Sequence, residues 1–249
     1  MPLPDQTIDT LHLRWYARRD DRPGDLAERW LSQCRRHLPA ALPRRFGDAE
    51  PLRGRLDRDG DAGFVAALAA TTGLLFTAGT RPAHGGSLPG ATPETWAGPV
   101  EVATLAVDHD TDVRGLLAGF ADAAGCFFAE ATVEHGVLLS EGELVHLGPS
   151  GSPYLAPLGR FAGLPPAPVT WTWFGPPYVR LVSRHLPGPT ELGGGLLQGW
   201  SEDGPDAAST WLPAALTARR PPDGGALEPA SRMPRGLGPS PWSRLRGHR

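Results

Sequence analysis

The sequence predicts an α+β fold: a two-layer sandwich of split βαβ type, with helices on one face of the sheet and a Gly/Pro-rich C-terminal extension. Three observations predict it. Strand-like and helix-like segments follow the order strand–helix–strand twice within the first 134 residues. The two clearest helical segments each carry one apolar stripe, which needs a sheet to cover it. The 32 glycines and 28 prolines gather in loops and beyond Leu186.

The first strand and helix are predicted by a change in apolar spacing. Within residues 8–17 the residues Leu11, Leu13 and Trp15 share one face, as in a strand with one buried side. From Asp25 apolar residues recur every fourth position, which predicts a helix that Pro39 bends or ends. After it we expect a loop over 43–61, a short helix over 63–70, a strand over 73–78 and a long loop over 81–94.

The second half begins with a strand over 98–108, which is apolar on both faces and therefore central. Asp110 or Thr111 is expected to cap the next helix, whose stripe consists of Val113, Leu116, Leu117, Phe120 and Ala124. Residues 126–134 predict the following strand, and 136–140 extend it or pair with it. Farther on we expect a strand through Val169, Trp171 and Trp173, a turn at 175–177 and an extended segment over 178–182.

The domain organisation follows from composition. We expect an α+β domain over 1–186 and a Gly/Pro-rich extension over 187–218, with a short helix at 206–219 that runs into the tail. Residues 219–249 are expected to be a disordered, arginine-rich tail, because they hold almost no apolar periodicity.

Charge and lysine content exclude several functions. The chain contains no lysine, which excludes a P-loop, a pyridoxal Schiff base and a Ser–Lys dyad. Seven arginines against one aspartate and one glutamate give residues 219–249 a charge of +5, so residues 1–218 carry −8 of the total of −3. An acidic body argues against nucleic acid as the main ligand and is compatible with a basic protein partner, although an ordinary soluble surface has the same balance.

Cys34 and Cys126 each lie within an apolar pattern, which predicts buried free thiols in a reducing compartment. The first ten residues do not resemble a signal peptide, and no apolar run approaches the length of a membrane span. We therefore expect a cytoplasmic protein that does not enter a membrane.

Two acidic clusters have the side chains of metal ligands. Asp57, Asp59 and Asp61 resemble the start of a calcium loop, but Ala62 and Leu68 stand where that loop needs glycine and glutamate, so a solvated acidic loop is favoured. The second cluster contains Asp108, His109, Asp110 and Asp112, and a metal there would need His84 or Glu134 as a distant further ligand. Because the cluster lies where a strand precedes a helix, capping of the helix N-terminus is favoured over metal binding.

Two further patterns allow enzymatic interpretations. Residues 84–87 (HGGS) resemble an esterase oxyanion-hole segment, but the nearest candidate elbow, 148–152, does not match G-x-S-x-G, so a tight glycine turn is favoured. The glutamates that could supply an acid/base pair are Glu130, Glu134, Glu141 and Glu143. Glu130 and Glu134 share one face of a strand, which is typical of a solvated sheet face.

An aromatic, proline-punctuated segment remains: Trp171, Trp173, Phe174, Tyr178 and Arg180. Large aromatics on a strand are commonly core residues. Tryptophan, tyrosine and arginine are also the usual hot spots of protein interfaces, and these five residues are our candidate partner-binding set.

The order of elements, the RP-x-H-GGS-x-P motif (81–89) and the GLPP-x4-W-x-WFGPPYV motif (163–179) resemble bacterial polymorphic-toxin immunity proteins and their uncharacterised relatives. The resemblance covers residues 10–185, and the segment after Leu186 does not belong to it. It implies a small, cytoplasmic, non-enzymatic protein that neutralises a cognate toxin by binding it.

The sequence therefore predicts a non-enzymatic, immunity-like protein-binding module, with no catalytic residues, metal or cofactor and with an undetermined oligomeric state. The main alternative is a hydrolase or metal-dependent enzyme whose dispersed site uses His84, Asp108 and His109, with Glu134. A further alternative is a scaffold whose tail binds acidic partners.

Overall fold

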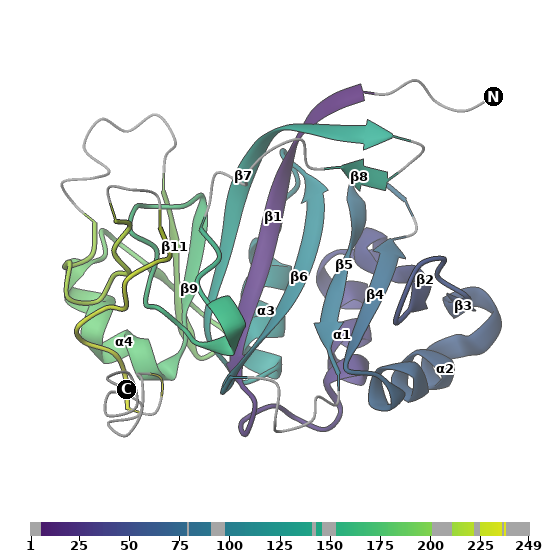
Figure 1. The fold of residues 1–249 in the computed structure, drawn as a ribbon, viewed down its shortest axis with the longest axis horizontal. Coiled ribbons are helices and arrows are strands. Elements are labelled where there is room, and N and C mark those ends of the chain that lie inside the picture. Colours follow the sequence, from purple (N-terminus) through teal and green to yellow (C-terminus); the bar gives the residue numbers. More distant parts are fainter. Residues whose placement is uncertain are drawn as a thin grey trace.

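The computed structural model describes residues 6–78, 80–90, 98–140, 143–145, 153–200, 211–221, 225–235 and 237. Its main feature is an open antiparallel sheet of ten consecutive strands, in the order β10-β11-β9-β7-β1-β6-β5-β4-β2-β3, with β8 paired to β7 (Figure 1). The strands span Gln6–Arg18 (β1), Pro43–Gly47 (β2), Gly54–Arg55 (β3), Gly73–Ala78 (β4), Ala83–Pro89 (β5), Val100–Asp108 (β6), Cys126–Ser140 (β7), Glu143–Val145 (β8), Trp171–Phe174 (β9), Thr190–Leu192 (β10) and Gly195–Gly199 (β11). The predicted α+β class is confirmed.

The centre of the sheet has the predicted split βαβ arrangement. Strands β6 and β7 are both antiparallel to β1, so they run parallel to each other with β1 between them. Helix α3 (Arg114–Ala123) connects them in sequence. Strand β1 thereby lies in the interior of the sheet, with hydrogen-bonded neighbours on both sides.

Three helices cover one face, which we call the helix face: α1 (Leu26–His37), α2 (Leu56–Ala70) and α3. The core beneath them takes Trp15 from β1, Trp30 from α1 and Phe120 from α3. These three rings meet edge to face, with centroids 4.8–5.6 Å apart. Helix α1 ends at His37, as the position of Pro39 predicted.

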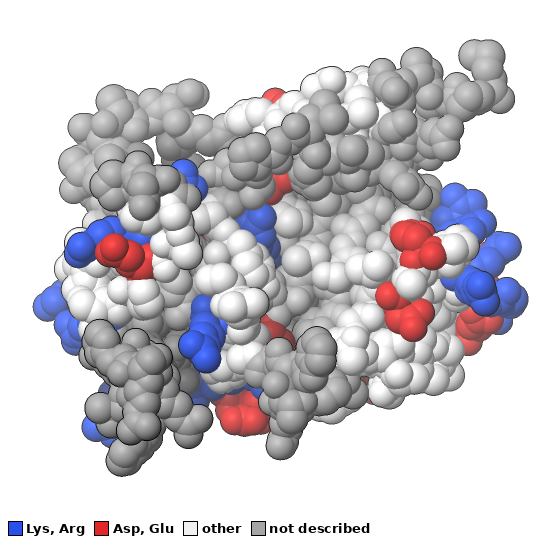
Figure 2. Space-filling model, in the orientation of Figure 1, with Lys and Arg blue, Asp and Glu red and all other residues white. Residues whose placement is uncertain are grey.

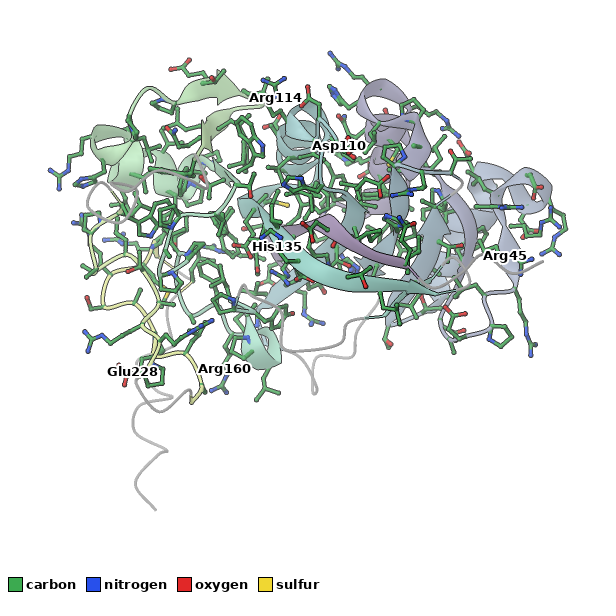
Figure 3. All side chains as sticks on the ribbon, turned by 90° about the horizontal axis from the view of Figure 1, so that it is seen from above. Arg45, Asp110, Arg114, His135, Arg160 and Glu228 are labelled. Atoms are coloured by element: carbon green, nitrogen blue, oxygen red, sulfur yellow. The ribbon has the colours of Figure 1, made fainter. Side chains whose placement is uncertain are left out.

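A second core lies on the opposite face, which we call the open face. Strand alternation sends Tyr16 and Phe174 there, while their neighbours Trp15 and Trp173 point to the helix face. Helix α4 (Pro176–Val182) adds Tyr178 and Val182 to this second core. Figure 3 shows the layers from above, with Arg114 on the helix side of the sheet and Arg160 on the other.

Three predicted loops or extended segments are wrong. Residues 43–61 contain β2, β3 and the first turns of α2. The predicted helix 63–70 is the end of α2, which is interrupted at Gly60 (φ 65°). The polar residues of 43–61 face outward, and several form Arg–Asp pairs that the spacing of apolar residues does not reveal. Residues 178–182 are helical because Pro176 and Pro177 occupy the first turn of α4, where proline fits.

The predicted loop 81–94 contains β5, and its residues 91–94 lie outside the described part of the chain. Gly85 and Gly86 belong to this strand and not to a tight turn. A Cβ on Gly86 would lie 1.9 Å from the Thr104 carbonyl oxygen, so glycine permits a close approach of two backbones.

The C-terminal segments add to the sheet and the second core. The predicted helix 206–219 is wrong for its described part, because 211–219 are not helical, and 206–210 lie outside the described residues. Ala230 and Leu237 are buried, and Arg219 pairs with Glu228 through backbone hydrogen bonds of 2.9 Å. The division into 1–186, 187–218 and a disordered tail 219–249 stays a prediction.

No helix in the described residues is long and apolar enough to span a membrane. Cys34 and Cys126 are buried and free, as expected, and burial raises the pKa of both thiols.

Candidate functional site

The structure scatters the five predicted partner-binding residues. Trp173, Phe174 and Tyr178 are fully buried in the two cores. Trp171 is half-buried, with the Arg114 guanidinium 5.6 Å from its ring centroid, and Arg180 is exposed on α4. A partner could therefore reach only Trp171 and Arg180 among the five without repacking the protein. Their role in binding stays a prediction.

A cluster of charged residues lies on the open face of β1 and β7. Register places Glu130 opposite Arg14. Arg14 lies 3.6 Å from Oε1 of Glu130 and 3.3 Å from Oε1 of Glu134, and the Tyr16 hydroxyl donates to Oε1 of Glu130 at 2.8 Å. Nδ1 of His12 is 3.5 Å from Glu134.

The predicted solvated face at Glu130 and Glu134 is therefore wrong. Glu130 is fully buried and Glu134 nearly so, because other parts of the chain cover β7 on this side of the sheet. The side chain of Glu143 and all of Glu141 lie outside the described residues. Burial raises the pKa of Glu130, although Arg14 opposes the shift. The pKa of Tyr16 is also raised, first by burial and then by the nearby Glu130 carboxylate. Arg14, Glu130 and Glu134 are thus almost fully buried together.

A second polar group lies where β5 begins and β6 ends. The Arg81 guanidinium donates two hydrogen bonds to the Asp108 carboxylate, at 2.7 and 2.9 Å, and Nε2 of His84 lies 2.9 Å from Oδ1 of Asp108. Burial raises the pKa of Asp108, but the hydrogen bonds from Arg81 and His84 outweigh it, so that the pKa is lowered. The structure thus brings together His84 and Asp108, whereas His109 is exposed in the following turn.

The predicted capping by Asp110 or Thr111 is wrong. The N-cap of α3 is Val113, whose side chain makes no capping bond. Asp112 instead accepts a hydrogen bond from the backbone N–H of Arg114 at 3.2 Å. Asp108 is committed to Arg81 and His84 at the end of β6.

Asp57, Asp59 and Asp61 lie in α2, not in a loop, and each pairs with an arginine at 2.6–2.7 Å. Hydrogen bonds from the Arg58 side chain and the Arg55 N–H lower the pKa of Asp59 to about 2. Among the described residues no three His, Cys, Asp or Glu side chains are grouped to hold a metal ion.

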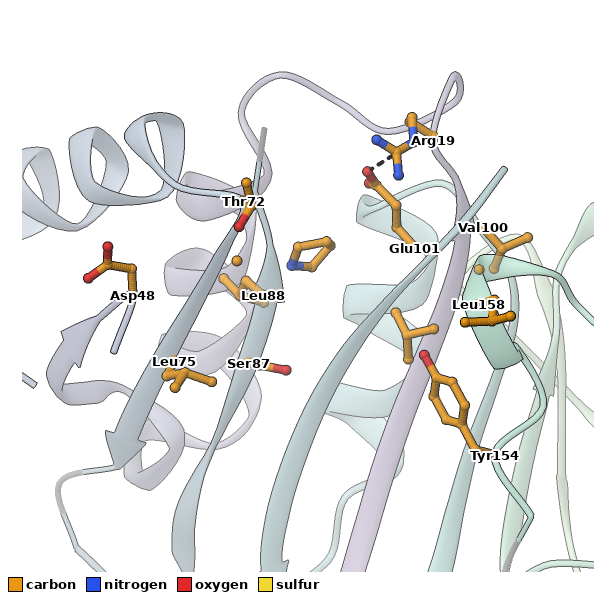
Figure 4. Close-up of a pocket in the computed structure, with 14 residues that line it drawn as sticks. Arg19, Asp48, Thr72, Leu75, Ser87, Leu88, Val100, Glu101, Tyr154 and Leu158 are labelled. Atoms are coloured by element: carbon orange, nitrogen blue, oxygen red, sulfur yellow. Dashed lines mark ion pairs between the residues drawn. The ribbon is translucent and has the colours of Figure 1, made fainter. Parts of the chain in front are cut away.

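The open face carries a groove that sequence reasoning did not find. Its volume is about 590 Å³, and it lies between β4, β5 and β6 on one side and the 154–159 segment on the other (Figure 4). We call it the Leu158 groove. Its lining includes Leu75, Leu88, Val100, Val102, Tyr154 and Leu158.

On this face, charged side chains lie at the β2–β3 end and also toward the opposite end of the molecule, with a stretch of uncharged surface between them (Figure 2). Only the short Pro-Leu-Gly sequence at 157–159 signalled a turn here, and no local pattern shows that this turn presents its leucine to solvent.

Comparisons with known proteins place the fold. No known protein family matches the sequence, and no curated protein is detectably similar to it. Among solved structures, the Pseudomonas aeruginosa T6SS protein PA0821 is similar, with a TM-score of 0.52 and 11% identity over 82% of this chain and 71% of that one. At this identity the likeness shows a shared fold.

Proposed function

We propose that the chain is a non-enzymatic, immunity-like protein-binding module that neutralises a cognate toxin domain in the cytoplasm by direct binding. The observation that carries the proposal is the fold shared with a T6SS protein over 82% of the chain, which agrees with the resemblance of residues 10–185 to toxin immunity proteins.

Charge and site chemistry support a binding role. The −8 charge of residues 1–218 suits a basic partner. The carboxyl group of Glu130 is fully buried and is contacted by Arg14 and Tyr16, so it offers no exposed group to a substrate.

Co-expression with toxin-like domains encoded beside this gene tests the proposal. We expect one such domain to be lethal alone, harmless with this protein, and to co-elute with it in a stable 1:1 complex. If none of the neighbouring products binds and none is neutralised, the proposal is wrong.

The contact between His84 and Asp108 favours a second candidate, an enzyme that uses this pair. A variant His84→Ala separates the two functions. The binding proposal expects unchanged neutralisation with this variant, whereas an enzymatic mechanism expects loss of protection while the complex still forms. Stoichiometric zinc or manganese in the purified protein would also favour the enzyme.

A further inference from the structure

Exposed apolar side chains gather at the Leu158 groove. The large hydrophobic residues that are exposed in the described part of the chain are Leu75 (39%), Tyr154 (49%), Leu158 (90%) and Leu192 (40%). The first three all line this groove. Single exposed apolar residues are ordinary, and here three of them lie around one hollow.

Leu158 is held outward by its backbone. It has φ 53° and ψ 33°, a left-handed conformation that is unfavourable for a residue with a Cβ. The turn has little freedom to relax, because its backbone at Gly159 lies close against that of Gly98. A Cβ added to Gly98 would lie 2.3 Å from the Gly159 carbonyl oxygen. Strain of this kind is retained where the surroundings impose it, and at Leu158 it presents an apolar side chain to solvent.

The ends of the groove differ in charge. At one end Arg19 and Glu101 form an ion pair at 3.6 Å, and Glu101 also lies 3.1 Å from Arg22 (Figure 4). Asp48 also lines the groove, is exposed, and forms no ion pair with the described residues. The groove therefore offers the exposed apolar side chains of Leu75, Tyr154 and Leu158 beside polar residues, together with one carboxylate available to a partner.

We propose that the Leu158 groove is the docking site for a short amphipathic segment of a protein partner, apolar along one side and carrying an arginine or lysine that faces Asp48. The inference rests on the proposed binding function and adds the surface and the chemistry of the partner. The apolar side covers Leu75, Tyr154 and Leu158, and the basic residue complements Asp48.

The charge of residues 1–218 disfavours the same part of a second copy as the occupant. Residues 1–218 carry −8, so an identical body would bring like charge toward the groove and its Asp48. A segment of opposite charge is attracted at long range and approaches faster at low ionic strength.

Calorimetry with the neutralised toxin domain tests the groove directly. Leu158→Asn keeps a residue that tolerates the left-handed conformation but removes the apolar anchor, and we expect affinity to fall about 30-fold, as for a central interface residue. The matched control is Leu192→Asn, an exposed leucine on β10 outside the groove, which should bind as the wild type does. Equal affinities for all three proteins would overturn the inference while the proposed function stands.

A peptide selection tests the groove without a toxin. Random twelve-residue peptides displayed on phage are selected on the full-length protein and counter-selected on Leu158→Asn. We expect enriched peptides with apolar residues and at least one arginine or lysine. Synthetic versions should bind Asp48→Arg at least about tenfold more weakly, and replacing their basic residue by glutamate should restore binding to that variant.

If no peptide is enriched, or if the enriched peptides bind Leu158→Asn and Asp48→Arg as well as they bind the wild type, the proposed docking site is wrong. If peptides are enriched but no toxin domain binds the protein, the proposed function alone is wrong.

Discussion

The hydroxyl of Tyr16 donates a 2.8 Å hydrogen bond to Oε1 of Glu130, across the pairing of β1 with β7, and both side chains are completely buried. The bond joins the central strand of the sheet to the carboxylate beside Arg14. A buried acceptor that loses its donor costs more than the bond itself contributes.

Tyr16→Phe should therefore lower the free energy of unfolding by about 1–3 kcal/mol, since it leaves Glu130 without this donor. Urea denaturation followed by circular dichroism measures the change. Tyr154→Phe is the matched control at an exposed tyrosine and should shift stability by less than about 0.5 kcal/mol. Equal effects of the two substitutions would contradict the role of the bond.

Glu130 should make stability depend on pH. Burial raises its pKa in the folded protein, so its contribution is fully present below the ordinary glutamate pKa of about 4.3 and is lost as pH rises through the raised pKa. Glu130→Gln still accepts from Tyr16 but does not titrate. We expect its stability to fall less than that of the wild type as pH rises above about 4, and parallel curves would count against the shift.

Gly86→Ala should destabilise the β5–β6 pairing strongly, because the added Cβ would lie 1.9 Å from the Thr104 carbonyl oxygen. Overpacking of this kind costs about 1–3 kcal/mol or more. Gly24→Ala is the control, since no atom lies within 4 Å of the added Cβ there. Melting temperatures distinguish them, and a Gly86→Ala protein as stable as the control would show that the strands can move apart.

Leu158→Gly should raise stability and lower partner affinity together. A left-handed residue with a Cβ costs about 1–2 kcal/mol, and the added freedom of glycine in the unfolded chain offsets about 0.5–1 kcal/mol of this gain, so a net gain of up to about 1.5 kcal/mol is expected. The same change removes the apolar anchor of the Leu158 groove. Chemical denaturation measures the change in stability and calorimetry measures the change in affinity. A loss of stability would disprove the strain.

The sequence predicted the elements whose apolar spacing is strong. The alternation around Trp15 and the fourfold spacing through Trp30 located β1 and α1, and the split βαβ unit followed from the order of segments. Residues 43–61 failed because arginine–aspartate pairs and glycines mask a strand pair and the start of a helix.

The candidate site was harder to predict because it depends on which layers cover each face. Glu130 and Glu134 have the spacing of a solvated strand face, and that spacing is the same when another layer covers them. The aromatic segment around Trp173 largely has the core position that large aromatics on a strand predict, since three of its five residues are buried. The exposure of Leu158 depends on one turn between distant segments, which no local pattern encodes.

The position of β1 has a consequence for synthesis on the ribosome. Strand β1 is made before both of its neighbours, since it pairs on one side with residues 100–108 and on the other with residues 126–139. Its apolar residues therefore lack their final neighbours until residue 139 has been made, and such delayed long-range pairing slows folding. The nascent chain is most exposed to aggregation during this interval, and a chaperone that binds β1 would protect it.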